Sequence, residues 1–363
     1  MEMRKKFDEI FEDCTKLGTK IKTDEYHSNG KHPIIDQGQE MVAGFTDLED
    51  GLLDAVPAIV FGDHTRIIKY VDCPFFLGAD GVKVLRSKVP NANYRYLYYA
   101  LKNAKIPNTG YNRHYKWLKE LEIEYPPIDQ QVKTVKVLDK VESIIYNRQN
   151  QLQKLDELVK ARFVEMFGGI HDSSLYPYVP VKELTHVISG GTPSRDVLEY
   201  WRDGTIPWVK TTELQNKIIT EVDEHITSKG LAASSAKIVP PNTTLIAMYG
   251  QGKTRGMTGY LGISASTNQA CACILPSPEI NSVYIWKYFE LSYDKLRNMA
   301  KGGNQPNLNG NMIKNFSVLV PPIKRQEEYV QFVNQVDKSK VAVQKSLDEA
   351  QLLFDSLMQH YFG

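Results

Sequence analysis

The sequence predicts an α+β protein in which two similar mixed α/β domains are separated by two long helices that pair as an antiparallel coiled coil. Three observations support this prediction. The motif PPIDQQ opens at Pro126, and a second copy, PPIKRQ, opens at Pro321, 195 residues later. A heptad pattern of apolar residues follows each copy, and the blocks that precede the two copies also resemble each other. The chain therefore carries a pseudo-twofold internal repeat, in the order block, helix, block, helix.

The stretch after each Pro-Pro pair predicts one long helix. Proline is tolerated in a first helical turn because its missing N–H would have no partner there, and glycine closes both stretches, at Gly168 and Gly363. A helix of about 38 residues spans roughly 55 Å. Apolar residues recur at alternating steps of three and four, as in a coiled coil. We predict that they pack in the seam between the helices, and they are Leu138, Val141, Ile145, Leu152, Leu155, Val159, Val333, Val336, Val343, Leu347, Phe354 and Leu357.

Basic residues interrupt this seam at Arg148, Arg162 and Lys340. Two interpretations are open. Long basic side chains can lay their methylene groups along the seam and keep their charge in water. Alternatively, these positions fix the register of the helices or meet acidic residues of a partner protein. Because a whole domain separates the two helices in the sequence, we expect them to pair in antiparallel orientation.

The order of elements indicates where the segments begin and end. The first block mixes helices and short strands irregularly, which is typical of an α+β domain, with a short helix expected over Phe7 to Leu17 and a longer one over Asn93 to Asn103. A linker rich in Gly, Ser and Pro covers Gly168 to Pro180. We predict four segments, with residues 1–125 as the first domain, 126–169 as the central helix, 170–320 as the second domain and 321–363 as the C-terminal helix.

The second block repeats the first with an offset that grows only in loops, where insertions are tolerated. Phe61-Gly62 aligns with Tyr249-Gly250, and Thr65-Arg66 aligns with Thr254-Arg255. Two similar domains suit a target that itself has two separated parts. Duplex DNA is such a target, because its grooves return about every 34 Å.

Composition describes an ordinary globular protein. The 363 residues are 42% hydrophobic and 24% charged, with a net charge of +1, so a DNA-binding surface must be local. The sequence has no apolar run near 18 residues that would span a membrane, and the start MEMRKKFDEIFEDC does not resemble a secretory signal. Cys271 and Cys273 lack zinc spacing and are expected to be buried thiols. We therefore expect a cytoplasmic protein.

A glycine-rich loop after the predicted strand LIAMY carries Gln251, Lys253, Thr254 and Arg255. A phosphate-binding P-loop would need glycine where Ala247 stands, and a helix where RGMTGYLGIS is strand-like. Lysine and backbone amides can reach DNA phosphates, whereas glutamine and arginine can form paired hydrogen bonds with A or G. We predict a DNA contact rather than an ATP site, with a solvated hairpin turn as the alternative.

Loops at matching places in both blocks carry further candidates. NTGYNRHYK, from Asn108 to Lys116, and KGGNQPNLN, from Lys301 to Asn309, precede the last strand of each block. Their amide, basic and aromatic groups, His114 among them, can read base edges and hold the sugar–phosphate chain, although such loops can also merely cap a domain. The predicted DNA-binding residues are His64, Thr65, Arg66, Tyr111, Asn112, Arg113, Lys116, Lys210, Gln251, Lys253, Thr254, Arg255, Lys301, Asn304 and Gln305.

No catalytic constellation stands out in the sequence. There is no His-Asp-Ser set, no HExxH and no pair of metal-binding carboxylates. The Asn/Asp-Pro-Pro-aromatic motif of amino-methyltransferases is also missing, since VPPNTT at Val239 is a turn. We expect a non-catalytic protein with no metal site.

The complete pattern resembles the specificity (S) subunit of type I restriction–modification systems over essentially all 363 residues. The resemblance rests on the two Pro-Pro-Ile-x-x-Gln helix starts and on two segments of the second half. These segments are SGGTPSRDVLEYWRDGTIPWVKTTEL, from Ser189 to Leu214, and KGGNQPNLNGNMIKNFSVLVPPIKRQEE, from Lys301 to Glu328. The first block departs from the pattern, because CTKLGTK stands where the second has Ser-Gly-Gly-Thr-Pro.

The resemblance implies a subunit that recognises a bipartite, asymmetric DNA sequence, with one half-site for each target-recognition domain. Two methyltransferase (M) subunits would dock on the helical spacer, and a restriction and translocation (R) subunit would complete the nuclease. S-adenosylmethionine, ATP and Mg would belong to these partners, with no cofactor in this chain. Three alternatives stay open: a bivalent scaffold or decoy without a DNA target, a DNA-dependent NTPase that uses Lys253, and attachment to a fused restriction–methylation enzyme.

Overall fold

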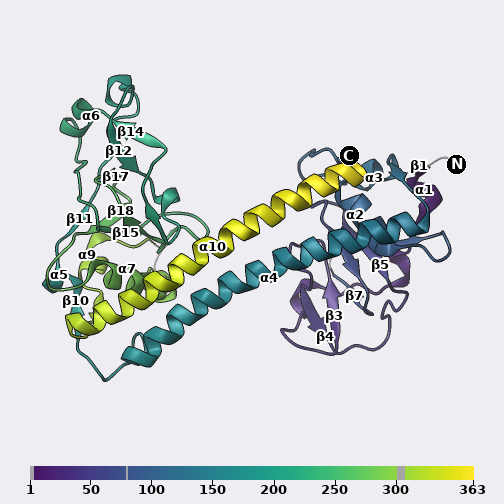
Figure 1. The fold of residues 1–363 in the computed structure, drawn as a ribbon, viewed down its shortest axis with the longest axis horizontal. Helices are drawn as coiled ribbons and strands as arrows, with labels where there is room; N and C mark the ends of the chain where they lie inside the picture. Colours follow the sequence, from purple (N-terminus) through teal and green to yellow (C-terminus); the bar gives the residue numbers. More distant parts are fainter. Residues whose placement is uncertain (1–3, 79–80, 301–306) are drawn as a thin grey trace. The chain divides into compact units, whose positions relative to one another are not determined.

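The computed structural model describes residues 4–78, 81–300 and 307–363. Its contacts divide the chain into two compact units. Unit 1 joins Met1–Asn150 to Gln344–Gly363, and unit 2 is Gln151–Val343. Each unit therefore holds one domain and part of both long helices, α4 (Ile128–Phe167) and α10 (Ile323–Phe362) (Figure 1). The division of the sequence into four segments stays a prediction.

In its described residues, unit 1 holds three small sheets and three α-helices that precede α4. Its strands pair in the orders β2-β8-β5-β6, β4-β3-β7 and β1-β9. The strands are β1 (Arg4–Lys6), β2 (Phe11–Asp13), β3 (His32–Ile35), β4 (Gly44–Thr46), β5 (Ala58–Gly62), β6 (Ile68–Val71), β7 (Phe76–Leu77), β8 (Val82–Ser87) and β9 (Glu122–Glu124). The helices are α1 (Phe7–Ile10), α2 (Tyr94–Lys102) and α3 (Tyr115–Lys119).

Unit 2 repeats this plan with one additional edge strand. Its strands pair in the orders β11-β18-β15-β16-β13, β14-β12-β17 and β10-β19. The strands are β10 (Tyr178–Pro180), β11 (Val187–Ser189), β12 (Ile206–Val209), β13 (Lys217–Ile219), β14 (Glu224–Ile226), β15 (Thr244–Ala247), β16 (Thr258–Leu261), β17 (Ser266–Thr267), β18 (Cys271–Ile274) and β19 (Ser317–Leu319). The helices before α10 are α5 (Val181–Leu184), α6 (Ser228–Ala232), α7 (Ser282–Leu291), α8 (Tyr293–Met299) and α9 (Gly310–Lys314).

The pairing of the strands confirms the internal duplication. In unit 1, β3 pairs antiparallel with β4 and parallel with β7. In unit 2, β12 pairs in the same way with β14 and β17. The first and last strands of each domain also pair, β1 with β9 and β10 with β19. Such detailed agreement in both order and direction is what two copies of one domain would give.

The two long helices are antiparallel. In unit 1, Leu138 and Val141 from the first part of α4 share a core with Phe354 and Met358 from the last part of α10. In unit 2, the order is reversed, since the last part of α4 shares a core with the first part of α10. Phe163, for example, packs edge-on against Tyr329 at 5.5 Å between ring centroids. The predicted α+β class and the antiparallel helical pair are both confirmed.

The predicted seam residues all lie away from open solvent. Seven of them are buried, namely Leu138, Val141, Val159, Val333, Val336, Val343 and Phe354. The other five are half-buried, namely Ile145, Leu152, Leu155, Leu347 and Leu357. Not all of this burial comes from the facing helix, because the domains also cover part of each helix.

A basic residue in the seam meets an acid of the facing helix. Lys340 Nζ on α10 lies 2.5 Å from Asp156 Oδ1 on α4 and 3.6 Å from Asp337 Oδ1 on its own helix. Arg162 stacks over the ring of Phe332 on α10, 5.5 Å from its centroid. These contacts favour the interpretation in which seam cations fix the pairing of the helices, with the acid supplied by this chain.

The repeated Pro-Pro-Ile-x-x-Gln motif forms the same hydrogen bond in both copies. Gln131 Nε2 donates to Pro126 O at 2.8 Å, and Gln326 Nε2 donates to Pro321 O at 2.7 Å. Both glutamines are buried. Each side chain therefore fixes the angle at which the chain enters its long helix. In unit 2, Gln326 Oε1 also accepts from the backbone N of Asn281, the residue that caps α7.

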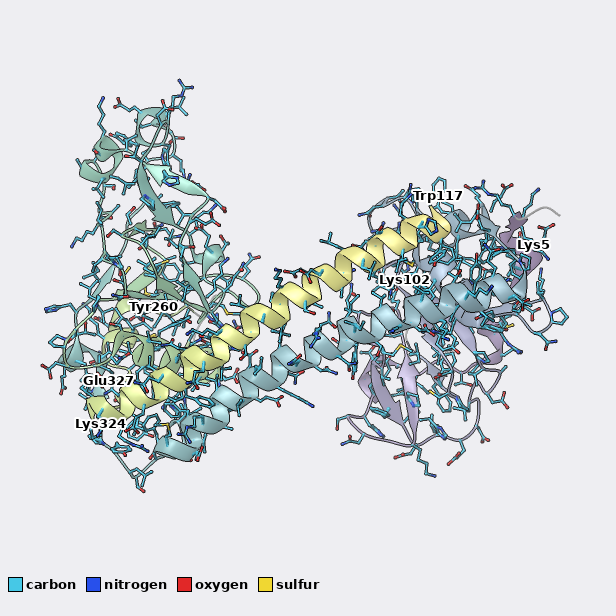
Figure 2. The ribbon with its side chains drawn as sticks, in the orientation of Figure 1. Lys5, Lys102, Trp117, Tyr260, Lys324 and Glu327 are labelled. Atoms are coloured by element: carbon cyan, nitrogen blue, oxygen red, sulfur yellow. The ribbon has the colours of Figure 1, made fainter. Side chains whose placement is uncertain are left out.

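An ion network ties each domain to its long helices. In unit 1, Arg95 on α2 lies 2.5 Å from Asp139 and 2.9 Å from Glu142 of α4. Lys102, which is labelled in Figure 2, lies 3.0 Å from Glu142. In unit 2, Asp337 occupies the position that matches Glu142 in the repeat, and Lys287 of α7 lies 3.8 Å from it. The acid thus stays at one helix position while its cation comes from different positions.

The prediction of a helix over Phe7 to Leu17 was wrong. Only Phe7–Ile10 is α-helical, and Phe11–Asp13 forms β2, which pairs with β8 so that Phe11 faces Ser87. Pairing with a distant strand has overridden the local helical pattern. The expected burial of Cys271 and Cys273 is confirmed, whereas Cys73 is exposed. Among the described residues, no helix is both long and apolar enough to cross a membrane.

Candidate nucleic-acid interface

In unit 1, two predicted loops meet. The loop after β5 carries His64, and the loop before α3 carries Tyr111, whose rings stack at 4.6 Å with an interplanar angle of 9°. Tyr111 is 85% exposed, so one face of the pair is open. Flat aromatic surfaces of this kind can pack against nucleotides, and Asn112 and Arg113 are exposed beside Tyr111.

A buried pair of residues fastens these two loops together. Asp63 is 4% exposed, and His114 is fully buried. The backbone N and ring Nδ1 of His114 lie 2.8 and 2.9 Å from Asp63 O, and Tyr115 N donates to Asp63 Oδ1 at 2.7 Å. Thr109 N donates to His114 Nε2 at 3.4 Å, which assigns the ring proton to Nδ1. In this structure His114 therefore holds the two loops together.

Gln37, which follows β3, forms hydrogen bonds that hold the loop after β5. Its side-chain Oε1 accepts from His64 N at 3.2 Å, and its backbone O accepts from Thr65 Oγ1 at 2.7 Å. The packing is close, because a Cβ at Gly81 would lie 2.8 Å from Gln37 Oε1 and from His64 Cδ2. Gln37 could not be predicted from a local pattern, since its partners lie 27 and 28 residues away in the chain.

Arg66 has a partner inside unit 1. Its Nη1 donates to Ile106 O at 3.3 Å, and its backbone has a φ of 63°, in the left-handed region. Thr65 is exposed, whereas His64 and Arg66 are half-buried. Arg66 thus braces the loop in this structure, and the predicted DNA contact by Arg66 stays a prediction. Lys116, on α3, is exposed and lies 4.9 Å from the ring centroid of Trp117.

In unit 2, the loop between β15 and β16 presents its predicted residues in two ways. Gln251 and Lys253 are exposed, whereas Thr254 and Arg255 are half-buried. Helix α8 lies against this loop, and its residues Tyr293 and Arg297 donate hydrogen bonds to carbonyl groups of the loop. The predicted residues Lys301, Asn304 and Gln305 lie outside the described residues.

Lys210 belongs to a different cluster of unit 2. Its Nζ lies 3.0 Å from Glu224 Oε1 and 3.4 Å from Asp223 Oδ2, and the hydrogen bond with Glu224 raises the pKa of Lys210. Burial alone would raise the pKa of Glu224, but bonds from Arg195 and Lys210 outweigh it and lower that pKa. Arg195 also stacks on Trp201, 3.7 Å from the ring centroid. In this structure Lys210 therefore forms ion pairs within unit 2, and its predicted DNA contact stays a prediction.

A groove of about 830 Å³ in unit 2 is lined by polar residues that are not among the predicted DNA-binding residues. Lys237 and Lys314 line it, together with Asn309, Asn311 and Asn315. Two lysines among amides are the groups that hold a sugar–phosphate backbone without reading its sequence. Asn309 ends the predicted loop that starts at Lys301, and Asn311 follows two residues later, so the amide-rich composition of this stretch was the available signal.

Comparison with known proteins identifies the family of both domains. The profile described as "Type I restriction modification DNA specificity domain" matches residues 3–157 and again 175–350. The chain is 22% identical to the EcoR124I/EcoR124II specificity subunit of Escherichia coli over 336 residues, which cover 87% of this chain and 82% of that protein. It is 27% identical to the MjaIX specificity subunit of Methanocaldococcus jannaschii over 165 residues, 43% of this chain and 37% of that protein.

Solved structures share the fold. The type I restriction–modification S subunit from M. genitalium matches with a TM-score of 0.60 at 17% identity, covering 98% of this chain and 94% of that one. A chain from a type I R-M system, solved to explain complex assembly and conformational transition, matches with a TM-score of 0.55 at 15% identity, covering 99% and 97%. With two matches to the family profile over most of its length, this chain belongs to the type I restriction–modification DNA specificity family.

Proposed function

We propose that this chain is the DNA-specificity subunit of a type I restriction–modification complex, and that each unit reads one half of a bipartite target. The observation that carries the proposal is the duplication itself. Two domains with the same strand order each place a loop, after β5 or after β15, at the position where Thr-Arg recurs. A protein with two such domains reads two half-sites and ignores the bases between them.

The chemistry of the loops supports an asymmetric target. Unit 1 offers the stacked rings of His64 and Tyr111, whereas unit 2 offers the exposed side chains of Gln251 and Lys253 on a glycine-rich turn. Aromatic faces stack on nucleotides or sugars, and lysine neutralises phosphate. Because the two loops differ in residue type, the two half-sites would differ in sequence.

The helical pair offers a docking surface for partner subunits. Several apolar side chains of α4 and α10 are exposed outside the seam, and two pairs of them match in the repeat. Tyr146 is 63% and Val341 is 71% exposed, and Leu158 is 46% and Leu353 is 51% exposed. Because these exposed apolar residues occur at matching positions of the two helices, they suit two copies of one partner. These partners would be methyltransferase (M) subunits, with a restriction/translocase (R) subunit completing the complex. S-adenosylmethionine, ATP and Mg would be held by them, and this chain would be non-catalytic.

The test maps methylated adenines across the genome of cells that express this chain with its M and R partners. We expect one split motif that disappears when the gene for this chain is deleted. Lys253→Ala should weaken binding of the assembled complex to that motif and reduce its salt slope by about one, because one phosphate contact is lost. Lys229→Ala is the control, since Lys229 is a 73% exposed lysine of the same unit.

Two outcomes would count against the proposal. If methylation is unchanged by the deletion and the chain binds no M or R subunit, the proposal fails and the scaffold or decoy interpretation remains. If Lys253→Ala and Lys229→Ala affect the salt slope equally, the loop after β15 does not touch DNA phosphates.

A further inference from the structure

The loop from Gly250 to Gly256 would be mobile if it depended on its own sequence. Three of its seven residues are glycines with positive φ, of 146° at Gly250, 58° at Gly252 and 87° at Gly256. Glycine gains most from disorder, so fixing such a loop costs more conformational entropy than fixing other sequences. Hairpin bonds close its base, where Gly256 N donates to Ala247 O at 2.8 Å. The residues between these bonds, Gln251 to Arg255, form the tip of the loop, and the tip needs other support.

Two side chains of α8 supply that support. Arg297 Nη1 lies 2.9 Å from Gly252 O and 3.1 Å from Arg255 O. Tyr293 donates its hydroxyl to Lys253 O at 2.7 Å and accepts from Arg297 Nη1 at 3.2 Å. Arg297 and Tyr293 together form a clamp, which bonds three carbonyl groups of the tip. Hydrogen bonds from a guanidinium ion are stronger than those from a neutral donor.

The clamp completes the hydrogen bonding of the loop carbonyls. Gln251 O accepts from Thr254 N at 3.2 Å, and Thr254 O accepts from Met257 N at 3.0 Å. Every carbonyl from Gln251 to Arg255 therefore accepts a bond from this chain. Because the peptide group is planar and trans, the N–H of Lys253 faces away from Arg297, opposite to the clamped carbonyl of Gly252. The tip thus turns the negative ends of its peptide dipoles inward, which favours an anion such as phosphate outside.

We propose that Arg297 and Tyr293 are positioning residues that fix the sequence-reading conformation of the loop Gly250–Gly256. The proposal rests on the proposed function, because it assigns the clamp to the half-site that unit 2 reads. Neither residue needs to touch DNA. Prior fixing of the loop removes the entropy cost of ordering it on binding and keeps Gln251 aimed at one base.

Unit 1 is built differently, so the effect is confined to one half-site. There, the arginine of the loop itself, Arg66, donates to Ile106 O in the segment after α2. In unit 2, an arginine in the segment after α7 donates to the loop. The direction of support is reversed between the two copies, and a change to the clamp leaves the bracing in unit 1 intact.

The experiment uses the complete complex and measures methylation rates on duplexes with the full motif and with each single-base change. The variants are Tyr293→Phe, which removes only the hydroxyl, and Arg297→Met, which keeps the aliphatic stem. Asn298→Ala, an exposed neighbour on α8, is the control. We expect the clamp variants to lose roughly tenfold in discrimination at positions of one half-site, the scale of one lost base contact. The other half-site should be read as in the wild type, and the thermal midpoint should move by less than about 3 °C.

The outcomes separate the two proposals. If the wild-type complex methylates no split motif that depends on this chain, both proposals fail. If the wild type reads a split motif and both clamp variants read it with unchanged discrimination, only the clamp is overturned. An equal loss at both half-sites, or a loss equal to that of Asn298→Ala, would also overturn it, because a general defect does not choose one half. Gln251→Ala identifies the half-site of unit 2 independently.

Discussion

His171 shows how one side chain makes unit 2 sensitive to acid. It follows α4, and its ring packs edge-on against Tyr288 and Phe316, with centroids 6.0 and 6.3 Å apart. Burial, assisted by the positive charge of Lys295, lowers the pKa of His171 to about 4, although Asp172 opposes the shift. The ring is therefore neutral in the folded protein at pH values where a free histidine is half protonated.

We predict that unit 2 loses stability as the pH falls from about 6.5 towards 4. In this range the unfolded chain binds a proton at His171 and the folded chain does not, so acid favours unfolding. Well above pH 6.5, His171 is neutral in both the folded and the unfolded chain, so its titration no longer lowers the free energy of unfolding. Urea midpoints at pH 7.5 and 5.5 should differ less in His171→Gln than in the wild type. His225→Gln, which changes an exposed histidine of the same unit, should keep the wild-type difference. Equal pH dependence in all three proteins would contradict the assignment.

At the scale of elements, α10 has an inner and an outer face within unit 1. Phe354 is 6% exposed, and its ring packs edge-on against Tyr99 of α2 at 6.1 Å. Lys102 also lies over this ring, 5.2 Å from its centroid. Leu352, two residues earlier on the same helix, is 70% exposed. The heptad position, and not hydrophobicity alone, decides which apolar residue stabilises the helix.

Phe354→Ala should lower the free energy of unfolding of unit 1 by about 3 kcal/mol, because a large buried side chain is replaced by a cavity. Leu352→Ala is the matched control and should change it by less than about 0.5 kcal/mol. Chemical denaturation followed by circular dichroism measures both. Similar losses for the two variants would show that the face with Leu352 is covered in solution.

The long helices could be predicted because their signal is local. A heptad repeat and the motif at Pro126 and Pro321 lie within the segments that they shape. The region after Phe7 could not be predicted in the same way, because the helical pattern stops where Phe11 pairs with Ser87, 76 residues later in the chain. A strand of three residues has little periodicity of its own, and its partner decides its conformation.

The same contrast between local patterns and distant contacts applies to the candidate site. Its loops were predicted because glycine and the Thr-Arg pairs recur at matching places. The groups that hold the loops were missed, since Gln37, Tyr293 and Arg297 lie far from them in sequence. The ion pair of Lys210 with Glu224 was likewise not visible, because a strand has to bring the acid near. Sequence patterns indicate which residues are exposed to a ligand more readily than which residues orient them.

At the scale of the whole molecule, the two units share both long helices, while the described buried residues of these helices fall into two separate cores. The part of the helical pair in unit 2 is held by Phe163, Tyr329 and Val333, and the part in unit 1 is held by Leu138 and Phe354. Cores that are separate in this way can open separately.

We predict that Phe354→Ala speeds hydrogen exchange of backbone amides in residues 128–150 and 344–362 only. Residues 151–167 and 323–343 should exchange as in the wild type, because the core of unit 2 is unchanged. Mass spectrometry of peptides from these four ranges measures the effect. Faster exchange in all four ranges would show that each long helix opens as one cooperative element.

The matching acids Glu142 and Asp337 limit where recombination can exchange a domain between related genes. Each acid lies on a long helix, while cations that meet it, Arg95 and Lys102 or Lys287, lie on the adjoining domain. A domain exchanged by recombination between α2 and α4, or between α7 and α10, would arrive without the acid that pairs with its cation. Crossovers that keep a domain together with its own stretch of helix would preserve the pairing. Gene shuffling would therefore tolerate breakpoints near the middle of α4 better than breakpoints between domain and helix.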